Sequence, residues 1–323
     1  MTDNRVVRAE NLTIRFTRKK MPDIVAARSV TLEVGEKETV ALVGESGSGK
    51  TTMGRALVRL LRLNSGTLWF KDQNVTTIRG QSLRRYHSQA QLIFQDPFGS
   101  LNPFHTVEYH LQRPLMKLRG LSRRGAREAV LDLLAQVGLT PTVIYRGKYP
   151  HELSGGQRQR VAIARALAGE PAFVVADEPV SMLDVSLRAE ILTLLESLQE
   201  QRHLSYLYIT HDLASARYLA HRIAVMYGAT IVEMAAADTV VRTPAHPYTR
   251  LLLAASVGSG AVALPETQSL APDLSASRRG CAFAPRCPQV MDRCRVQAPK
   301  LVDIEPGHAT ACFLYHDGES RED

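Results

Sequence analysis

The sequence predicts an α/β fold built around a mostly parallel sheet. Short, continuous apolar runs occur at Thr39–Val43, Phe173–Ala176 and Tyr206–Ile209, and stretches with helical spacing lie between them. Such runs are typical of strands buried on both faces, and their alternation with helices favours parallel pairing. Between Arg5 and Val34 the apolar residues instead alternate with a period of two. That pattern predicts antiparallel strands at the start of the chain.

Four stretches place their apolar residues at helical spacing. The first begins at about Lys50, and its pattern continues through Leu60 and Leu61. The others are residues 126–137, 157–167 and 187–198. Two of the four fall in a mixed region, about residues 96–167, which we expect to form a helical subdomain.

The bulk composition is that of a globular protein. The chain has 323 residues, of which 45% are hydrophobic and 22% are charged. Its apolar runs are much shorter than the ~20 residues that a membrane-spanning helix needs, and its first residues lack the apolar core of a signal peptide. We therefore expect a cytoplasmic protein that reaches a membrane only through a partner. The net charge of +8 fits a solvated surface, nucleic acid or anionic lipid headgroups, and charge alone does not choose among them.

A composition break divides the chain. Residues 256–277 are rich in Gly, Ala, Ser and Pro, which predicts a linker. We therefore expect one domain at residues 1–255, a linker at 256–278 and a small C-terminal extension at 279–323. All four cysteines lie in this extension.

A phosphate-binding loop follows the first predicted buried strand. Residues 44–51 read Gly-Glu-Ser-Gly-Ser-Gly-Lys-Thr, which is the G-x-x-x-x-G-K-[ST] pattern. Its glycines let backbone N–H groups wrap around a phosphate, and the N-terminus of the next helix adds a favourable field for anions. Lys50 is placed to meet the β- and γ-phosphates, and Thr51 offers a hydroxyl to Mg²⁺. The residues expected to bind nucleotide here are Gly44, Glu45, Ser46, Gly47, Ser48, Gly49, Lys50, Thr51 and Thr52.

Polar motifs also stand at the ends of the other predicted buried strands. The acidic pair Asp177-Glu178 ends the second run, and His211 stands at the end of the third. Ligands of open α/β sheets lie beyond the carboxyl ends of the strands. We therefore expect both motifs to converge with the phosphate loop on one edge of the sheet.

A second glycine-rich segment, Leu153 to Gln157, reads Leu-Ser-Gly-Gly-Gln. Ser154 is a good N-cap for the helix that begins near Gln157. The two glycines expose backbone N–H groups beside that helix N-terminus. The segment is therefore a second anion site in a chain that already has one.

With these two segments in this order, the chain resembles the ATP-binding subunits of ABC transporters. The resemblance implies a P-loop ABC ATPase cassette: a mostly parallel core sheet, an antiparallel β subdomain and a helical subdomain that carries the signature segment. It also implies that the chain hydrolyses ATP with Mg²⁺. In such a cassette Asp177, Thr51 and Gln95 serve the Mg²⁺. Glu178 is then the general base, and His211 contacts the γ-phosphate.

The resemblance assigns the second anion site to another subunit. Residues Ser154, Gly155, Gly156 and Gln157 would contact the γ-phosphate of ATP held by a partner ATPase, either a second copy or a related chain. Ser181 to Asp184 matches the loop at that interface, with Met182 in place of the more usual Ala. One position departs from the family: no aromatic residue stands near Asp23 to stack on adenine. Phe16 is a candidate if the loop folds back, and the adenine-stacking residue stays open.

The flanking sequences are similar to those of the dipeptide, oligopeptide and nickel import branch. They are Phe94–Pro103, Tyr149–Gln157, Thr243–Leu252 and Gly280–Pro288. This branch implies two transmembrane permease subunits, a periplasmic substrate-binding protein and a place on the cytoplasmic face of the inner membrane. We expect di- or oligopeptide import, with nickel, glutathione or oligosaccharide as alternative cargo. A soluble ABC ATPase acting on nucleic acid or ribosomes is disfavoured, because the chain has one cassette and no sustained heptads.

The cysteines follow the spacing Cys-x5-Cys-x6-Cys-x17-Cys. Zinc ribbons use pairs two to four residues apart, and no such pair occurs here. In this branch, the resemblance implies that such cysteines hold a [4Fe–4S] cluster. Zinc and free thiols remain the alternatives at this point. The four residues are Cys281, Cys287, Cys294 and Cys312.

Overall fold

The computed structural model describes residues 4–19, 22–256, 274–275 and 277–315. Most of the predicted linker at 256–278, and the end of the predicted extension beyond residue 315, therefore lie outside the described residues.

The centre of the molecule is an eight-stranded mixed sheet with the order β11-β12-β10-β9-β3-β8-β7-β6. Its strands are β3 Thr39–Val43, β6 Ala90–Ile93, β7 Phe173–Asp177, β8 Ser205–Thr210, β9 Arg222–Tyr227, β10 Thr230–Ala236, β11 Val302–Glu305 and β12 His308–Thr310. The strands from β9 to β6 pair in parallel, as the three buried runs predict. The remaining pairs are antiparallel. The C-terminal extension thus adds a hairpin to the edge of the central sheet.

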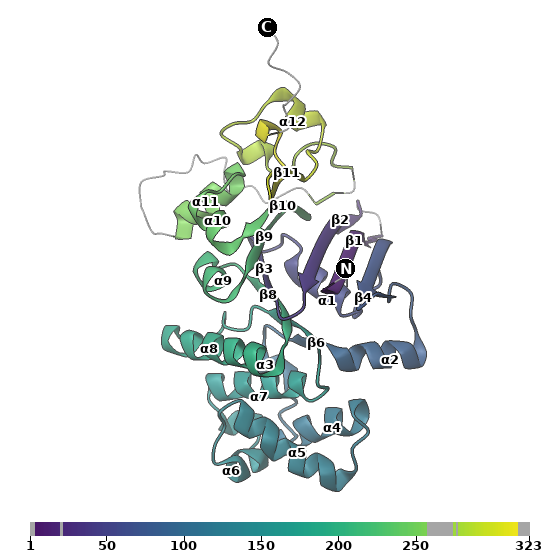
Figure 1. Cartoon of the computed structure of the whole chain (residues 1–323), viewed down its shortest axis with the longest axis vertical. Helices are drawn as coiled ribbons and strands as arrows, with labels where there is room; N and C mark the ends of the chain where they lie inside the picture. Colours follow the sequence, from purple (N-terminus) through teal and green to yellow (C-terminus); the bar gives the residue numbers. More distant parts are fainter. Residues whose placement is uncertain (1–3, 20–21, 257–273, 276, 316–323) are drawn as a thin grey trace.

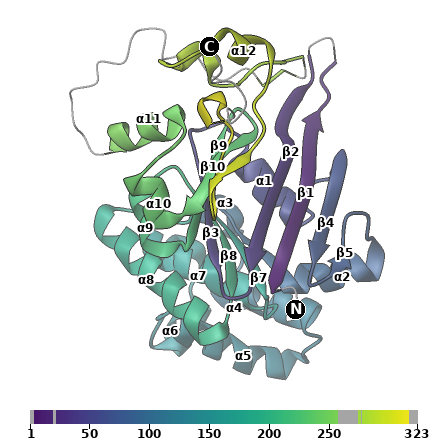
Figure 2. The same cartoon turned by 45° about the horizontal axis from the view of Figure 1, so that its top comes forward.

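A second, antiparallel sheet has the order β2-β1-β4-β5. Its strands are β1 Arg5–Phe16, β2 Ile24–Gly35, β4 Ser65–Phe70 and β5 Gln73–Asn74. The antiparallel pairing of β1 with β2 confirms the period-two prediction. In Figures 1 and 2 this sheet lies on one side of the central strands, and α8 and α9 lie on the other.

Alternate residues of the central strands feed two separate apolar cores. Val40 and Leu42 of β3 belong to the core shared with the antiparallel sheet and α1. Ala41 and Val43 belong to the core that reaches into the helices α4, α5 and α7. All four are completely buried, which explains why the strand reads as a continuous apolar run.

The helices lie between and around the strands. They are α1 Lys50–Leu57, α2 Gly80–Gln89, α3 Pro97–Ser100, α4 Val107–Leu118, α5 Arg123–Gln136, α6 Thr142–Gly147, α7 Gly155–Leu167, α8 Val185–Arg202, α9 Leu213–Leu219, α10 Ala237–Arg242, α11 Pro247–Ser256 and α12 Asp292–Val296. Figure 1 shows α4 to α7 gathered at one end of the molecule, while α12 and β11 lie at the opposite end.

The predicted continuation of α1 to Leu61 is wrong. The helix ends at Leu57, and Arg59 adopts a left-handed conformation with φ of 58°. The N–H of Leu60 then bonds the carbonyl of Arg55 at 2.9 Å, as in a Schellman C-cap. Apolar spacing alone did not reveal this stop, because the left-handed residue is an arginine and not the usual glycine.

Candidate nucleotide site

The phosphate loop joins the buried end of β3 to the N-terminus of α1. Gly49 has φ of 108°, and a Cβ there would lie 1.9 Å from the carbonyl oxygen of Ala26. At Gly44 a Cβ would lie 2.1 Å from the carbonyl oxygen of Met226. The neighbouring strands therefore require glycine at both positions.

Lys50 is held inside this loop. It is only 4% exposed, and its ammonium donates to the carbonyl oxygens of Gly44 and Glu45 at 2.7 and 2.9 Å. Burial lowers the pKa of Lys50, although the nearby carboxylates of Glu178, Asp177 and Glu45 oppose the shift. A partly desolvated ammonium at the N-terminus of a helix is a strong anion ligand.

The acidic pair meets the loop from the end of β7. The Thr51 hydroxyl donates to Asp177 Oδ1 at 2.9 Å. Burial raises the pKa of Asp177, while this hydrogen bond lowers it in part. Two oxygen ligands of the kind that Mg²⁺ prefers thus lie side by side next to Lys50.

Glu178 has two partners from other elements. Gln95 Nε2 donates to Glu178 Oε2 at 3.1 Å. His211 Nδ1 lies 3.3 Å from the same oxygen. The backbone of Glu178 is left-handed, with φ of 45°, which is uncommon for a residue other than glycine.

These residues meet at a single cleft of about 770 Å³, called the phosphate cleft below. The sequence-predicted members among its lining residues are Gly44, Glu45, Ser46, Gly47, Gly49, Lys50, Thr51, Thr52, Gln95, Glu178 and His211. Ser48 and Asp177 are buried just beneath it. The convergence expected from the strand ends is therefore present in the structure.

The far end of the cleft is apolar and holds a feature that sequence reasoning missed. Phe16, Ile24 and Ala26 line it from the antiparallel sheet, together with Leu252 and Leu274. Leu274 is placed by a hydrogen bond from the Val25 N–H to its carbonyl at 2.9 Å. Phe16 supplies the aromatic ring there, whereas no local sequence signal pointed to Leu274.

The signature segment, Leu153 to Gln157, lies outside this cleft. Ser154 caps α7, and Gln157 completes a capping box: the Gln157 N–H donates to Ser154 Oγ at 3.3 Å, and the Ser154 N–H donates to Gln157 Oε1 at 3.1 Å. Gly155 faces Leu183, just before α8, and Gly156 faces Leu187 in the first turn of α8. Within the described part of the chain, the lining of the phosphate cleft includes none of residues 154–157 and not Asp184.

Two family models match this chain. The ABC transporter model matches residues 27–181, and the model for the oligopeptide/dipeptide transporter C-terminal region matches residues 232–294. A probable peptide ABC transporter ATP-binding protein, y4tS of Sinorhizobium fredii, is 41% identical over 96% of this chain and 90% of its own length. A putative oligopeptide transport ATP-binding protein, YkfD of Bacillus subtilis, is 38% identical over 98% of each chain.

The chain belongs to the ABC transporter family of ATP-binding proteins. The ATP-binding cassette MJ0796, solved as a dimer in a post-hydrolysis state bound to ADP and Pi, is similar in structure with a TM-score of 0.65 and 30% identity. The match covers 72% of this chain and 98% of MJ0796. The cassette fold is thereby confirmed, and the phosphate cleft belongs to an ATPase that binds ATP with Mg²⁺.

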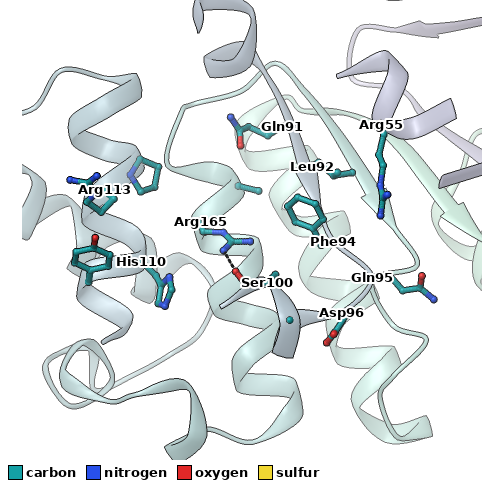
Figure 3. A pocket seen from close by; sticks show the side chains of 14 residues that line it. Arg55, Gln91, Leu92, Phe94, Gln95, Asp96, Ser100, His110, Arg113 and Arg165 are labelled. Atoms are coloured by element: carbon teal, nitrogen blue, oxygen red, sulfur yellow. Dashed lines mark hydrogen bonds between the residues drawn. The ribbon is translucent and has the colours of Figure 1, made fainter. Parts of the chain in front are cut away.

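The cassette carries a second cleft, of about 790 Å³, beside Gln95. Its walls come from β6, the turn at α3, α4 and α7. Figure 3 shows Phe94 and Gln95 on the loop after β6, with His110 and Arg113 across the cleft on α4. Arg165 on α7 donates to the carbonyl of Ser100. No helix in the described residues has the length and apolar character needed to span a bilayer.

The four cysteines of the cassette's extension line one small cavity with Phe283 and Phe313. They are free cysteines, and the N–H of Cys281 donates to the carbonyl of Cys294 at 2.8 Å. Burial raises the pKa of Cys281 and Cys312, and raises that of Cys287 to about 11. As these side chains stand, the described residues contain no group of three or more His, Cys, Asp or Glu that could hold a metal ion.

Proposed function

We propose that this chain is the ATP-hydrolysing subunit of a bacterial importer for di- or oligopeptides. One observation carries the proposal: the phosphate loop, Asp177, Gln95 and the Glu178–His211 pair meet in one cleft, in a chain that also matches the oligopeptide/dipeptide transporter C-terminal region. We also propose the division into a cassette at residues 1–255, with a helical subdomain at about 96–167, and an extension at 279–323.

The roles follow from the placement of each group. The loop N–H groups and Lys50 bind the phosphates. Thr51, Asp177 and Gln95 offer the oxygen ligands for Mg²⁺, which neutralises phosphate charge when it is bound. Glu178 orients and deprotonates the attacking water, with Gln95 and His211 holding its carboxylate in place.

The catalytic unit is a dimer of cassettes. Gly155 and Gly156 present N–H groups at the start of α7, outside the phosphate cleft of their own chain. We assign Ser154, Gly155, Gly156, Gln157 and Asp184 to the nucleotide held by the partner cassette. The partner is a second copy or a related chain, and two nucleotides lie between the two cassettes.

The cleft beside Gln95 is the docking place that we propose for the permease subunits. It borders Gln95, so movement there reaches the Glu178 carboxylate through one hydrogen bond. We place the chain on the cytoplasmic face of the inner membrane, with two permeases and a periplasmic substrate-binding protein as its partners.

The extension is proposed to hold a [4Fe–4S] cluster. The four thiols line one cavity whose walls are apolar, and four thiolates are the usual ligand set of such a cluster. Cys281, Cys287, Cys294 and Cys312 would be the ligands. The iron–thiolate bonds would cross-link a small extension that has little apolar core of its own. Absence of iron and sulfide in anaerobically purified protein would rule it out.

The import function is tested by deletion and replacement in the source bacterium. A strain without this chain should lose uptake of a radiolabelled tripeptide, and the wild-type chain should restore that uptake. Lys50→Ala should not restore it. Unchanged peptide uptake in the deletion strain would overturn the proposed cargo. Parallel uptake of labelled nickel, glutathione and an oligosaccharide identifies the alternative.

A further inference from the structure

The C-terminal extension contacts the phosphate loop through a partly buried ion pair between Arg286 and Glu45. Arg286 donates from Nη1 to Glu45 Oε2 at 2.8 Å and from Nη2 to Glu45 Oε1 at 3.0 Å. The Arg286 side chain is only 8% exposed. Arg286 and Glu45 are 241 residues apart in sequence, so this contact exists only because the extension folds back on the loop.

Several groups fix the geometry of this pair. Arg286 Nη1 also donates to the Tyr227 hydroxyl at 3.3 Å, and the guanidinium lies 5.8 Å from the centre of the Phe283 ring. The N–H of Glu45 donates to the Tyr248 hydroxyl at 2.9 Å. Aromatic side chains therefore hold both partners of the ion pair: Tyr227 and Phe283 contact Arg286, and Tyr248 bonds the backbone of Glu45.

The charge of Glu45 is the reason that this pair matters. Glu45 lies within the loop that wraps the phosphates, and an uncompensated carboxylate there repels an anionic ligand. Lys50 is shared with the phosphates and with two loop carbonyls. Arg286 is the guanidinium that meets both Glu45 oxygens, and such a fork cancels the carboxylate charge in a fixed geometry.

We propose that Arg286 is a positioning residue for ATP binding: by neutralising Glu45, it makes the affinity of the phosphate loop depend on the folded C-terminal extension. Arg286 stands directly before Cys287, whose thiol lines the cysteine cavity. A change in that cavity therefore reaches the phosphate loop through Arg286, in addition to the packing of Phe283 against Tyr248. This inference rests on the proposed ATP site.

The test is equilibrium binding of a fluorescent ATP analogue to the purified full-length chain. Arg286→Met should weaken binding about tenfold, because the Glu45 charge is then unopposed. Glu45→Gln in the same chain should return the affinity to within about threefold of wild type. Arg293→Met is the matched control: Arg293 lies in the same extension and packs over Phe313, and its variant should bind like wild type.

Two results would overturn the inference. In one, Arg286→Met binds ATP like the Arg293→Met control. In the other, the double variant stays as weak as Arg286→Met, so that the arginine acts only as a structural anchor. If Arg286→Met does not fold, Glu45→Gln decides: tighter binding than wild type supports neutralisation, because the Arg286 charge is then unopposed, and unchanged or weaker binding refutes it. Failure of the wild-type chain to bind the analogue would instead refute the ATP site itself.

A kinetic measurement on the assembled transporter completes the test. Arg286→Met should raise the KM for ATP by about tenfold and leave kcat within about twofold, since Arg286 does not touch the reacting atoms. Equal losses in kcat and in kcat/KM would place the residue in the chemical step and overturn the assignment.

Discussion

The phosphate loop and the signature segment are both glycine-rich N-termini of helices, yet their surroundings differ. At the start of α1, the buried Lys50 bonds the loop carbonyls, and Asp177 at the end of β7 accepts a hydrogen bond from Thr51. At the start of α7, Ser154 is exposed and Gln157 closes a capping box with it. The first site has a cation and carboxylates that can take part in ATP hydrolysis, whereas the second offers mainly N–H groups to an anion.

This difference supports the proposal that one chain carries one half of each of two composite sites. A helix N-terminus attracts phosphate wherever it occurs, but hydrolysis also needs a base and a metal ligand set. Within the described residues, the phosphate loop lies in one cleft with Glu178, and Thr51 bonds Asp177. In the proposed dimer, the α7 end contacts the nucleotide that the second cassette holds.

The largest expected effect is at Glu178, the proposed general base. Glu178→Gln keeps the shape of the side chain but removes the basic carboxylate, so ATP hydrolysis should fall by about 10²–10⁴-fold. ATP binding should persist, because Lys50 and the loop are unchanged. Steady-state ATPase assays with parallel binding measurements check this. Hydrolysis at the wild-type rate would contradict the role of Glu178.

The next largest effect tests the α7 end. Ser154→Asp retains a good N-cap but places a negative charge where the partner's γ-phosphate would lie. ATPase activity should fall by about 10²-fold, with the melting temperature and single-chain ATP binding unchanged. Wild-type turnover by this variant would show that α7 does not meet a nucleotide.

Mixing the two variants tests directly whether the base of one chain acts together with the α7 end of another. An equal mixture of Glu178→Gln and Ser154→Asp chains forms mixed dimers, in which one site pairs an intact base with an intact α7 end. Activity should recover to about a quarter of wild type, the share of sites rebuilt in a homodimer with two-fold symmetry. No recovery above either variant alone would argue against sites shared between two copies of this chain.

A smaller effect is expected at the apolar end of the phosphate cleft. Phe16→Ala removes the aromatic ring that lines it and should weaken ATP binding about tenfold. Phe104→Ala, at a side chain that is 84% exposed, is the control. Binding titrations with ATP and with triphosphate alone check the cause, since only the affinity for ATP should change.

The smallest effect concerns pH and His246, which lines the cysteine cavity. Burial lowers the pKa of His246 to about 3, and its Nδ1 accepts from the N–H of Tyr248 at 3.0 Å. Below about pH 6.5 the imidazole of His246 becomes protonated in the unfolded chain, whereas it stays neutral in the folded chain. The free energy of unfolding should therefore fall by about 1.4 kcal/mol per pH unit below 6.5.

Denaturant titrations between pH 7 and 4 measure this slope. His246→Asn should remove its share of the slope, because asparagine stays neutral in both states and still accepts a hydrogen bond. His151→Asn, at an exposed histidine before the signature segment, should keep the wild-type slope. Equal slopes in wild type and His246→Asn would mean that His246 does not control acid stability.

The elements that the sequence predicted well are those whose cause is local. The buried strand Thr39–Val43, the antiparallel start of the chain and the Ser154 cap all appear, because the apolar patterns of the strands and the capping motif are carried by neighbouring residues. The stop of α1 at Leu57 was missed, because a left-handed arginine carries no distinctive sequence signal. Strand ends also predicted the meeting of the phosphate loop with Glu178, since parallel strands share one carboxyl edge.

Sites that are formed by residues close together in sequence could thus be predicted from the sequence alone. They are the phosphate loop, the acidic pair at the end of β7 and the second anion site. Contacts between distant segments could not be predicted in this way. Leu274 at the apolar end of the cleft, the hairpin β11–β12 at the edge of the central sheet, and the Arg286–Glu45 pair all arise from the path of the chain through space. Such contacts have no period or motif, because long-range packing selects the partner only after the local elements have formed.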